Sequence, residues 1–200
     1  PDDDRWTAFV AGTRMAFISV QADEAEYYTK IESKQEQTKL AQGLPNVGDS
    51  SKSNKREAET VARLIHTLCQ LYSRSGIPFS PCKQIGIIVP FRAQIAMIRK
   101  ALAERHIPDT ADITIDTVER YQGSQRDIII FSTTVSRPYQ LSILSEPVMT
   151  DGREIDRKLN VALTRARKQF FMTGNETLLR NCTAYRKFLD FLSKEQILRL

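Results

Sequence analysis

Short runs of residues that are apolar at nearly every position recur along this chain, and they constrain its fold more than any other feature. Residues 84–89 read Gln-Ile-Gly-Ile-Ile-Val and end at Pro90, and residues 127–131 read Asp-Ile-Ile-Ile-Phe. Similar runs occupy residues 15–20, 113–115 and 168–173. A continuously apolar run predicts a strand that is buried on both faces, which is typical of a parallel sheet.

Helical periodicity fills the stretches between these runs. Asn54 is a candidate helix cap, with Glu57 three residues further on, as in a variant of the capping box. Apolar residues then recur at helical spacing as far as Tyr72, and Gly76 predicts the end of this helix. Further helices are expected over residues 91–105, 153–167 and 175–194. Strands that alternate with helices predict an α/β fold, with a mainly parallel sheet and helices on both faces.

The length of 200 residues suits one sizeable domain. Residues 21–53 are rich in Gln, Glu, Lys, Ser and Gly, and we expect a polar loop or insertion there. Residues 133–152 are expected to form a long loop. The chain starts with Pro rather than Met, so we expect a fragment of a longer polypeptide.

The charge of the chain is unevenly distributed. The net charge is +5, yet residues 1–50 hold five Lys or Arg and nine Asp or Glu. Residues 51–200 hold twenty-four Lys or Arg and fifteen Asp or Glu. A basic body suits a polyanionic partner, although an ordinary solvated surface explains the same counts.

The cysteines and the hydropathy narrow the class of protein further. Cys69, Cys82 and Cys182 include no pair with Cys-x-x-Cys spacing, so we expect no metal site and three reduced thiols, as in a cytoplasmic protein. We expect no membrane partner, because no stretch approaches the roughly 18 apolar residues that span a bilayer.

The first segment whose residues could bind a ligand is 87–94, where a strand ends at Pro90 and a helix begins. Phe91, Arg92 and Gln94 follow at the carboxyl end of that strand. Helix-start amides, a cation and an aromatic ring at this position suit a phosphate or a base. Taken alone, a purely structural junction explains the segment better.

The second segment is residues 117–127, between two expected strands. Gln122 and Gly123 allow close approach of the backbone to a ligand, because Gly has no Cβ. Thr117 offers a hydroxyl and an amide to a phosphate oxygen. Without its neighbours this segment would read as a solvated polar turn.

The third segment is residues 157–167, which we expect to be helical. On a helical wheel Leu159 and Ala162 lie on an apolar stripe, and Arg165 and Arg167 point in nearly opposite directions. An Arg held rigidly beside small residues is suited to stabilise a transferring phosphoryl group. A surface Arg on an amphipathic helix is the simpler reading of any one of them.

The order and wording of the three segments resemble motifs IV, V and VI of superfamily 1 helicases. The nearest branch is superfamily 1B, which includes the nonsense-mediated-decay RNA helicase and the Okazaki-processing helicase–nuclease. Residues 159–167, Leu-Asn-Val-Ala-Leu-Thr-Arg-Ala-Arg, match motif VI of that branch with hardly a change. The likeness extends over residues 54–180, and Asn54 with Glu57 fits the helix before motif IV.

The resemblance implies a RecA-like three-layer sandwich that serves as the second motor domain of a helicase. Arg165 would then be the arginine finger on the γ-phosphate, and Gln122, Gly123 and Gln125 would approach the nucleotide. An acidic residue often stands in this branch at the position of Gln125, so the sequence departs from the pattern at the ribose contact. The single-strand track would be lined by Pro90, Phe91, Arg92, Gln94 and Thr117.

The same resemblance implies partners that this chain does not contain. The sequence has neither a Gly-x-x-x-x-Gly-Lys-Ser/Thr phosphate loop nor an Asp-Glu pair of the Walker B type. In the family both belong to a RecA-like domain upstream, which would hold most of the ATP and Mg²⁺. We therefore expect single-stranded DNA or RNA and this upstream domain as partners, and no turnover by this chain alone.

Other classes of protein remain open from the residues themselves. A degenerate helicase-like module that only binds nucleic acid would need no Arg at position 165. A different enzyme on a parallel sheet would need a carboxylate cluster for Mg²⁺, for which Asp116, Glu119 and Asp127 are the local candidates. A structural or adaptor role is a third alternative, which the motif order disfavours.

Overall fold

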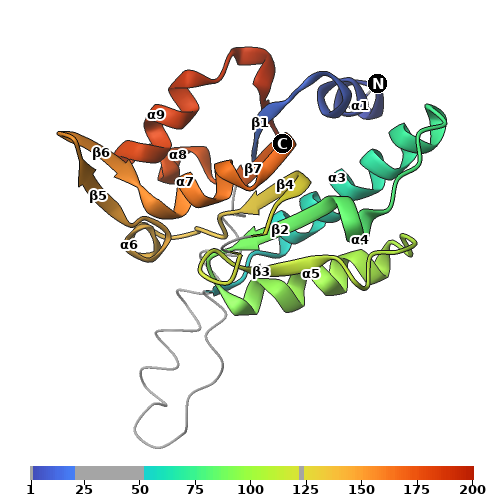
Figure 1. The fold of residues 1–200 in the computed structure, drawn as a ribbon, viewed down its shortest axis with the longest axis horizontal. Coiled ribbons are helices and arrows are strands. Elements are labelled where there is room, and N and C mark those ends of the chain that lie inside the picture. Colours follow the sequence, from blue (N-terminus) through green and yellow to red (C-terminus); the bar gives the residue numbers. More distant parts are fainter. Residues whose placement is uncertain (1, 21–51, 122–123) are drawn as a thin grey trace, which may run out of the picture.

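A computed structural model of the chain describes residues 2–20, 52–121 and 124–200. Its centre is a six-stranded sheet in which every pairing is parallel (Figure 1). The strands lie in the order β3 (Thr114–Thr117), β2 (Ile85–Val89), β4 (Arg126–Ser132), β7 (Ala166–Gly174), β1 (Met15–Ser19) and β8 (Ile197–Arg199). The parallel sheet predicted from the apolar runs is confirmed. The expected insertion at 21–53 lies almost wholly outside the described residues.

Helices cover both faces of this sheet, which gives three layers (Figure 1). One face carries α1 (Asp2–Gly12), α3 (Lys55–Arg74) and α5 (Arg92–Glu104). The other carries α7 (Arg157–Thr164), α8 (Glu176–Leu179) and α9 (Thr183–Phe191). The central strands therefore bury side chains on both sides: Ile128 and Ile130 face the first layer, while Ile129 and Phe131 face the second.

The long helix α3 follows its sequence signals at both ends. The Asn54 side chain accepts a hydrogen bond of 3.0 Å from the Glu57 amide, as predicted for a helix cap. Val61, Ile65 and Leu68 form its buried face. Beyond the last turn Gly76 adopts a φ of 64°, where glycine is favoured because it has no Cβ.

Helix α1 was not predicted, because its sequence is acidic at the start and only weakly periodic. It is fixed by its partner helix rather than by its own pattern. The Trp6 indole Nε1 donates to Thr67 Oγ1 at 2.8 Å, and the Arg63 guanidinium lies 4.4 Å from the centre of the Trp6 ring.

The expected long loop at 133–152 and helix at 153–167 are both partly wrong. Residues 133–156 contain η2 (Pro138–Gln140), α6 (Leu141–Leu144) and a hairpin of β5 (Pro147–Thr150) and β6 (Arg153–Asp156). Asp151 and Gly152 form the turn, with φ angles of 50° and 72°. An Asp-Gly pair is a strong hairpin signal, because both central residues of a type I′ turn need positive φ.

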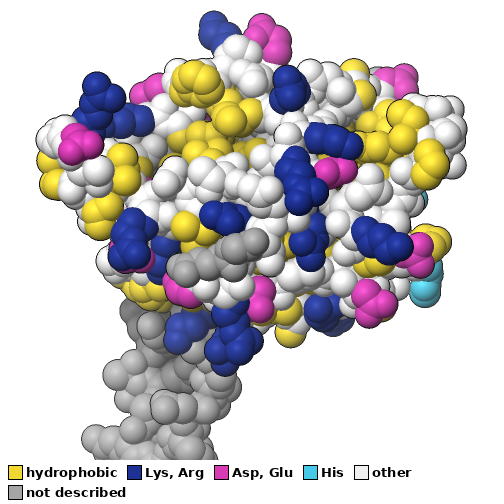
Figure 2. All heavy atoms as spheres, in the orientation of Figure 1, with side chains coloured by type: hydrophobic (Ala, Val, Ile, Leu, Met, Phe, Trp, Pro, Cys, Tyr) yellow, Lys and Arg dark blue, Asp and Glu magenta, His cyan; other side chains and the backbone are white. Residues whose placement is uncertain are grey.

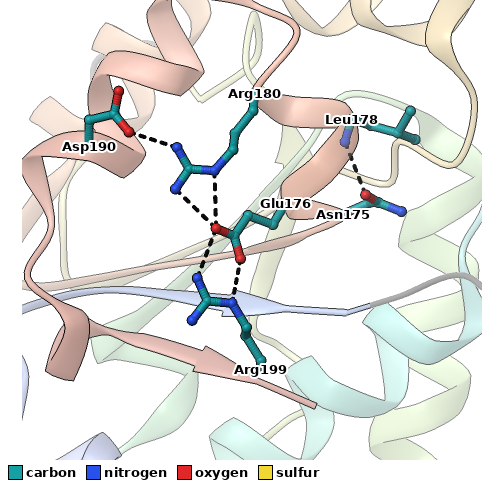
Figure 3. Close-up of polar contacts among 6 residues, drawn as sticks. All are labelled: Asn175, Glu176, Leu178, Arg180, Asp190 and Arg199. Carbon is teal, nitrogen blue, oxygen red and sulfur yellow. Dashed lines mark hydrogen bonds and ion pairs between the residues drawn. The ribbon is translucent and has the colours of Figure 1, made fainter.

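The expected closing helices over 175–194 are confirmed as α8 and α9, and two short elements follow: η3 (Lys194–Gln196) and β8. An ion-pair network joins α8, α9 and β8 (Figure 3). The Glu176 carboxylate forms ion pairs with Arg199 at 2.8 Å and with Arg180 at 3.0 Å, and Arg180 also pairs with Asp190 at 2.6 Å. The network holds the last strand against the body of the domain.

Candidate functional site

The candidate site residues separate into two groups on opposite edges of the sheet. Because all six strands run in one direction, the sheet has an edge of strand starts and an edge of strand ends. Pro90 and Thr117 lie where β2 and β3 end, with Arg92 just beyond in the first turn of α5. Arg165 and Gln125 lie where β7 and β4 begin. We call these the carboxyl edge and the amino edge.

At the amino edge, Arg165 lies outside the helix, whereas the sequence predicted a helical position for it. Helix α7 ends at Thr164, Arg165 is its C-cap residue, and Ala166 already pairs with Arg126 in the sheet. The Arg126 amide donates to the Arg165 carbonyl at 3.0 Å. The opposite-flank argument for Arg165 and Arg167 is therefore wrong, because strand β7 draws the chain out of the helix before either residue.

Two arginines at this edge carry buried donors that have no partner. The Nε atoms of Arg165 and Arg126 are buried, and neither has a hydrogen-bond acceptor within the described part of the chain. The terminal nitrogens of Arg126 are held by the Gln125 carbonyl at 2.9 Å and by Thr114 Oγ1 at 3.2 Å. A buried, unpaired donor on a charged group is costly, so an acceptor supplied by a ligand would be favourable here.

The polar residues around these arginines are already paired. Gln125 Oε1 accepts from Arg167 Nε at 3.4 Å, and Asp127 pairs with Lys168 at 2.9 Å. The hydrogen bond and charge of Lys168 keep the pKa of Asp127 below its ordinary value. The two remaining nucleotide candidates, Gln122 and Gly123, lie outside the described residues.

At the carboxyl edge, Arg92 is exposed and Pro90 is half-buried, so both remain accessible to a nucleic-acid strand. Phe91 is only 6% exposed, because its side chain packs inside as α5 begins. The sequence did not anticipate this burial. Phe91 therefore supports the edge and does not present a ring face for a base to stack on.

Gln94 is fully buried and its amide group is engaged on both sides. Its Oε1 accepts from the Asn54 amide at 2.7 Å, and its Nε2 donates to the Asn54 carbonyl at 3.0 Å. The expectation that Gln94 lines the track is not what this geometry favours. The side chain ties the start of α3 to the start of α5, which makes it a positioning residue.

Glu57 is the residue of this edge that the sequence reading missed, since it noted only a capping role. Its carboxylate is fully buried and its Oε2 accepts from Ser132 Oγ at 2.7 Å, the Thr134 amide at 3.1 Å and Thr173 Oγ1 at 3.0 Å. Burial outweighs these hydrogen bonds and raises the pKa of Glu57 to about 7. The polar run Ser132-Thr-Thr134 directly after an apolar strand was the available signal.

Thr117 has both of its donors engaged. Its amide donates to Asp116 Oδ1 at 2.8 Å, and its hydroxyl hydrogen-bonds the Glu119 carboxylate. Glu119 in turn pairs with Lys158 of α7 at 3.2 Å. Desolvation works against the charge of Glu119, but the hydrogen bonds of its own amide, Thr117 and Lys158 together lower its pKa.

Lys and Arg side chains are spread over the surface that Figure 2 shows, with Asp and Glu side chains scattered among them. No group of three or more His, Cys, Asp and Glu in the described ranges is arranged to hold a metal ion. No helix within those ranges has the length and apolar character to cross a bilayer. The cysteines are free thiols.

A six-stranded parallel sheet between two helical layers defines an α/β domain of the RecA-like class. A family model described as an AAA domain (AAA_12) matches residues 9–177. The chain therefore belongs to this family, and it is a superfamily 1 helicase domain of the branch that its motifs resemble.

Similar proteins carry helicase names. The chain is 32% identical over 155 residues to the putative helicase MOV-10 of Gallus gallus, with 71% of the chain aligned. It is 34% identical over 103 residues to the DNA polymerase alpha-associated DNA helicase A of Saccharomyces cerevisiae, with 51% of the chain aligned. It is 31% identical over 139 residues to the DNA replication ATP-dependent helicase/nuclease DNA2 of Bos taurus, with 68% aligned. The aligned parts span 15%, 14% and 12% of these three relatives.

Proposed function

We propose that this chain is the second, C-terminal motor domain of an ATP-dependent superfamily 1 helicase. In this proposal Arg165 is the arginine finger, and the carboxyl edge contributes part of a track for single-stranded DNA or RNA. The helicase names of the relatives support the class of activity. The single observation that carries the assignment is the buried Arg165 Nε at the end of α7, which has no hydrogen-bond partner among the described residues.

The position of Arg165 suits a finger for physical reasons. The backbone of Arg165 is fixed twice, since its amide donates to the Ala162 carbonyl and its carbonyl accepts from the Arg126 amide. A guanidinium on such a fixed backbone loses little freedom when it binds an oxyanion. Charge that develops on a transferring phosphoryl group is stabilised best by donors that are already in place.

ATP and Mg²⁺ fit the amino edge only in part. The described residues there offer cationic and amide donors but no carboxylate cluster for a metal ion. The proposal therefore gives this chain Arg165 and Gln125, together with Gln122 and Gly123 from the sequence, for contacts to the nucleotide. An upstream RecA-like domain would supply the phosphate loop and the metal ligands.

The proposed contacts to single-stranded nucleic acid are chosen by which residues of the carboxyl edge are accessible. Arg92 is exposed in the first turn of α5, where its charge and the helix-start amides suit a phosphate. Pro90 precedes it in the chain, and Thr117 ends the neighbouring strand, because Val89 pairs with Thr117 in the sheet. Phe91 and Gln94 hold this edge from within.

The test is ATP turnover by the polypeptide that includes the upstream domain, with and without single-stranded DNA or RNA. We expect strand-stimulated turnover that falls by orders of magnitude in Arg165→Ala, while strand binding persists. Absent turnover in the native protein, or unchanged turnover in the variant, would leave a helicase-like module that only binds nucleic acid.

A further inference from the structure

A chain of polar contacts joins the carboxyl edge to the helix that carries Arg165. It starts at Thr117, whose hydroxyl bonds Glu119, and it continues through the 3.2 Å ion pair of Glu119 with Lys158. Lys158 is the second residue of α7, the helix that Arg165 caps. The candidate strand contact and the candidate finger are therefore linked although they lie at opposite edges of the sheet.

Lys158 is the centre of this link. Its ammonium Nζ reaches Glu119 and also donates to the Ile143 carbonyl at 2.9 Å, at the end of α6. The Lys158 side chain is only 18% exposed, whereas the Glu119 side chain is 59% exposed, so solvent reaches the pair from the Glu119 side. One cation thus ties α7 to two segments, 117–121 and 141–144.

Apolar packing strengthens the same junction. Val118 and Tyr121, which flank Glu119 in the sequence, share a buried cluster with Leu159 and Ala162 of α7. Helix α7 has only eight residues, and its start is further fixed by Asp156, which accepts from the Leu159 amide at 2.8 Å. A shift of Glu119 or Lys158 would therefore move a short, rigid helix rather than one loose side chain.

We infer that the Glu119–Lys158 ion pair couples occupancy of the strand contact at Thr117 to the placement of Arg165. A phosphate oxygen that accepts the Thr117 hydroxyl takes from Glu119 one of its two side-chain partners, leaving Lys158. Lys158 also neutralises Glu119, whose charge would otherwise repel that phosphate. Lys158 is thus a positioning residue for the finger. The inference rests on the proposed function and adds to it the route by which a strand stimulates turnover.

The experiment compares Lys158→Met with the native protein in the polypeptide that includes the upstream domain. ATP turnover is measured without nucleic acid and with saturating single-stranded oligothymidine or oligouridine. We expect the ratio of stimulated to basal turnover to fall about tenfold, the range of coupling that one contact between two sites carries. Because the strand is saturating, weaker binding does not produce this loss.

Matched variants separate coupling from a merely structural role. Glu119→Gln should lower the ratio as Lys158→Met does, and Lys158→Arg should keep most of the native ratio. The double variant Glu119→Lys with Lys158→Glu, which exchanges the two charges, should recover at least half of the native ratio. Lys100→Met is the control, because Lys100 forms a 3.9 Å pair with Glu104 on an exposed face of α5. Should Lys158→Met lower the melting temperature, Glu119→Gln decides, since the Glu119 side chain is 59% exposed.

The outcomes distinguish this inference from the function on which it rests. If Arg165→Ala leaves turnover unchanged, the proposed function fails. If Arg165→Ala abolishes turnover while Lys158→Met and Glu119→Gln keep the native ratio within about twofold, only the coupling inference is overturned. The same holds if Lys100→Met lowers the ratio as much as Lys158→Met does.

Discussion

Two buried polar side chains at the carboxyl edge and two arginines at the amino edge differ in how their hydrogen-bonding atoms are satisfied. At the carboxyl edge the carboxylate of Glu57 and the amide of Gln94 are fully enclosed, and protein groups occupy their hydrogen-bonding atoms. At the amino edge the buried Nε atoms of Arg126 and Arg165 have no such partner in the described residues. A satisfied network fixes a structure, whereas a charged donor without a partner favours a ligand that brings an acceptor, which is why the proposed function places the nucleotide contact at the amino edge.

The largest expected effect tests the chemistry of the amino edge. Arg165→Ala should lower strand-stimulated ATP turnover by about 10³-fold or more, because a finger acts only on the transferring phosphoryl group. Arg167→Ala should lower it by about tenfold at most, since Arg167 is exposed and donates to Gln125. Steady-state turnover with each variant checks this. Equal losses in the two variants would contradict the assignment of the finger to Arg165.

The next effect concerns the buried carboxylate of the carboxyl edge. The pKa of Glu57 is raised from 4.5 to about 7, so between these values the folded state holds a proton that the unfolded chain has released. Stability from this group is therefore full below about pH 4.5 and declines as the pH rises to about 7, by about 2–3 kcal/mol. Glu57→Gln should remove this slope.

Denaturant unfolding of the native protein and Glu57→Gln across this pH window checks the expectation. Lys55→Gln is the control, because Lys55 belongs to the same turn of α3 but forms an exposed pair with Glu59. It should keep the native slope. A parallel pH dependence in native protein and Glu57→Gln would show that Glu57 does not titrate in this range.

A smaller effect is expected from crowding at the amino edge. A Cβ on Gly86 of β2 would collide with the Tyr121 hydroxyl and would lie 3.0 Å from Arg126 Cγ. Gly86→Ala should therefore destabilise the domain by about 1–3 kcal/mol and displace Arg126. Thermal unfolding measures the loss. Gly12→Ala, where a Cβ meets nothing within 4 Å, should leave the melting temperature nearly unchanged, and equal shifts in both variants would argue against the crowding.

The smallest effect belongs to the exposed cation of the carboxyl edge. Arg92→Ala should weaken single-strand binding about three- to tenfold and reduce the slope of log affinity against log salt by about 1, as expected for one phosphate contact. Arg105→Ala, at the far end of the same helix, is the control. Fluorescence anisotropy titrations at several salt concentrations give both quantities. Identical salt slopes in the native protein and Arg92→Ala would remove Arg92 from the track.

The elements that depend on local patterns were predictable from the sequence. The central strands and α3 are buried along one or both faces, so their composition and caps identify them. The hairpin at 147–156 could also have been predicted, since Asp151-Gly152 is a turn pair, but the periodicity of 153–167 favoured a helix that is longer than α7 at both ends. Helix α1 and strand β8 depend on contacts with distant residues, Thr67 and Ile18, which no local pattern reveals.

The sequence named candidate site residues, and whether they form the site stays a prediction; their geometry was not predictable. Motif order selected Arg165, Arg92 and Thr117, yet it placed Arg165 inside a helix and offered Gln94 to the strand. Burial decides these points, and burial of a polar side chain depends on which distant groups pair with it. Gln94 can be buried because the Asn54 backbone, forty residues away in sequence, presents a donor and an acceptor to it, and Ser132 Oγ accepts from it as well.

The short strand β8 has a consequence for how the domain is handled in the laboratory. Phe17, Ile18 and Ser19 of β1 pair with β7 on one side and with residues 197–199 on the other, and the Leu200 amide donates to the Ser19 carbonyl at 3.1 Å. Trimming the chain before residue 197 would leave an apolar strand with a bare row of amides and carbonyls. An unpaired outer strand of this kind recruits strands of other molecules, so the trimmed protein would aggregate through β1 while its motif residues remained intact.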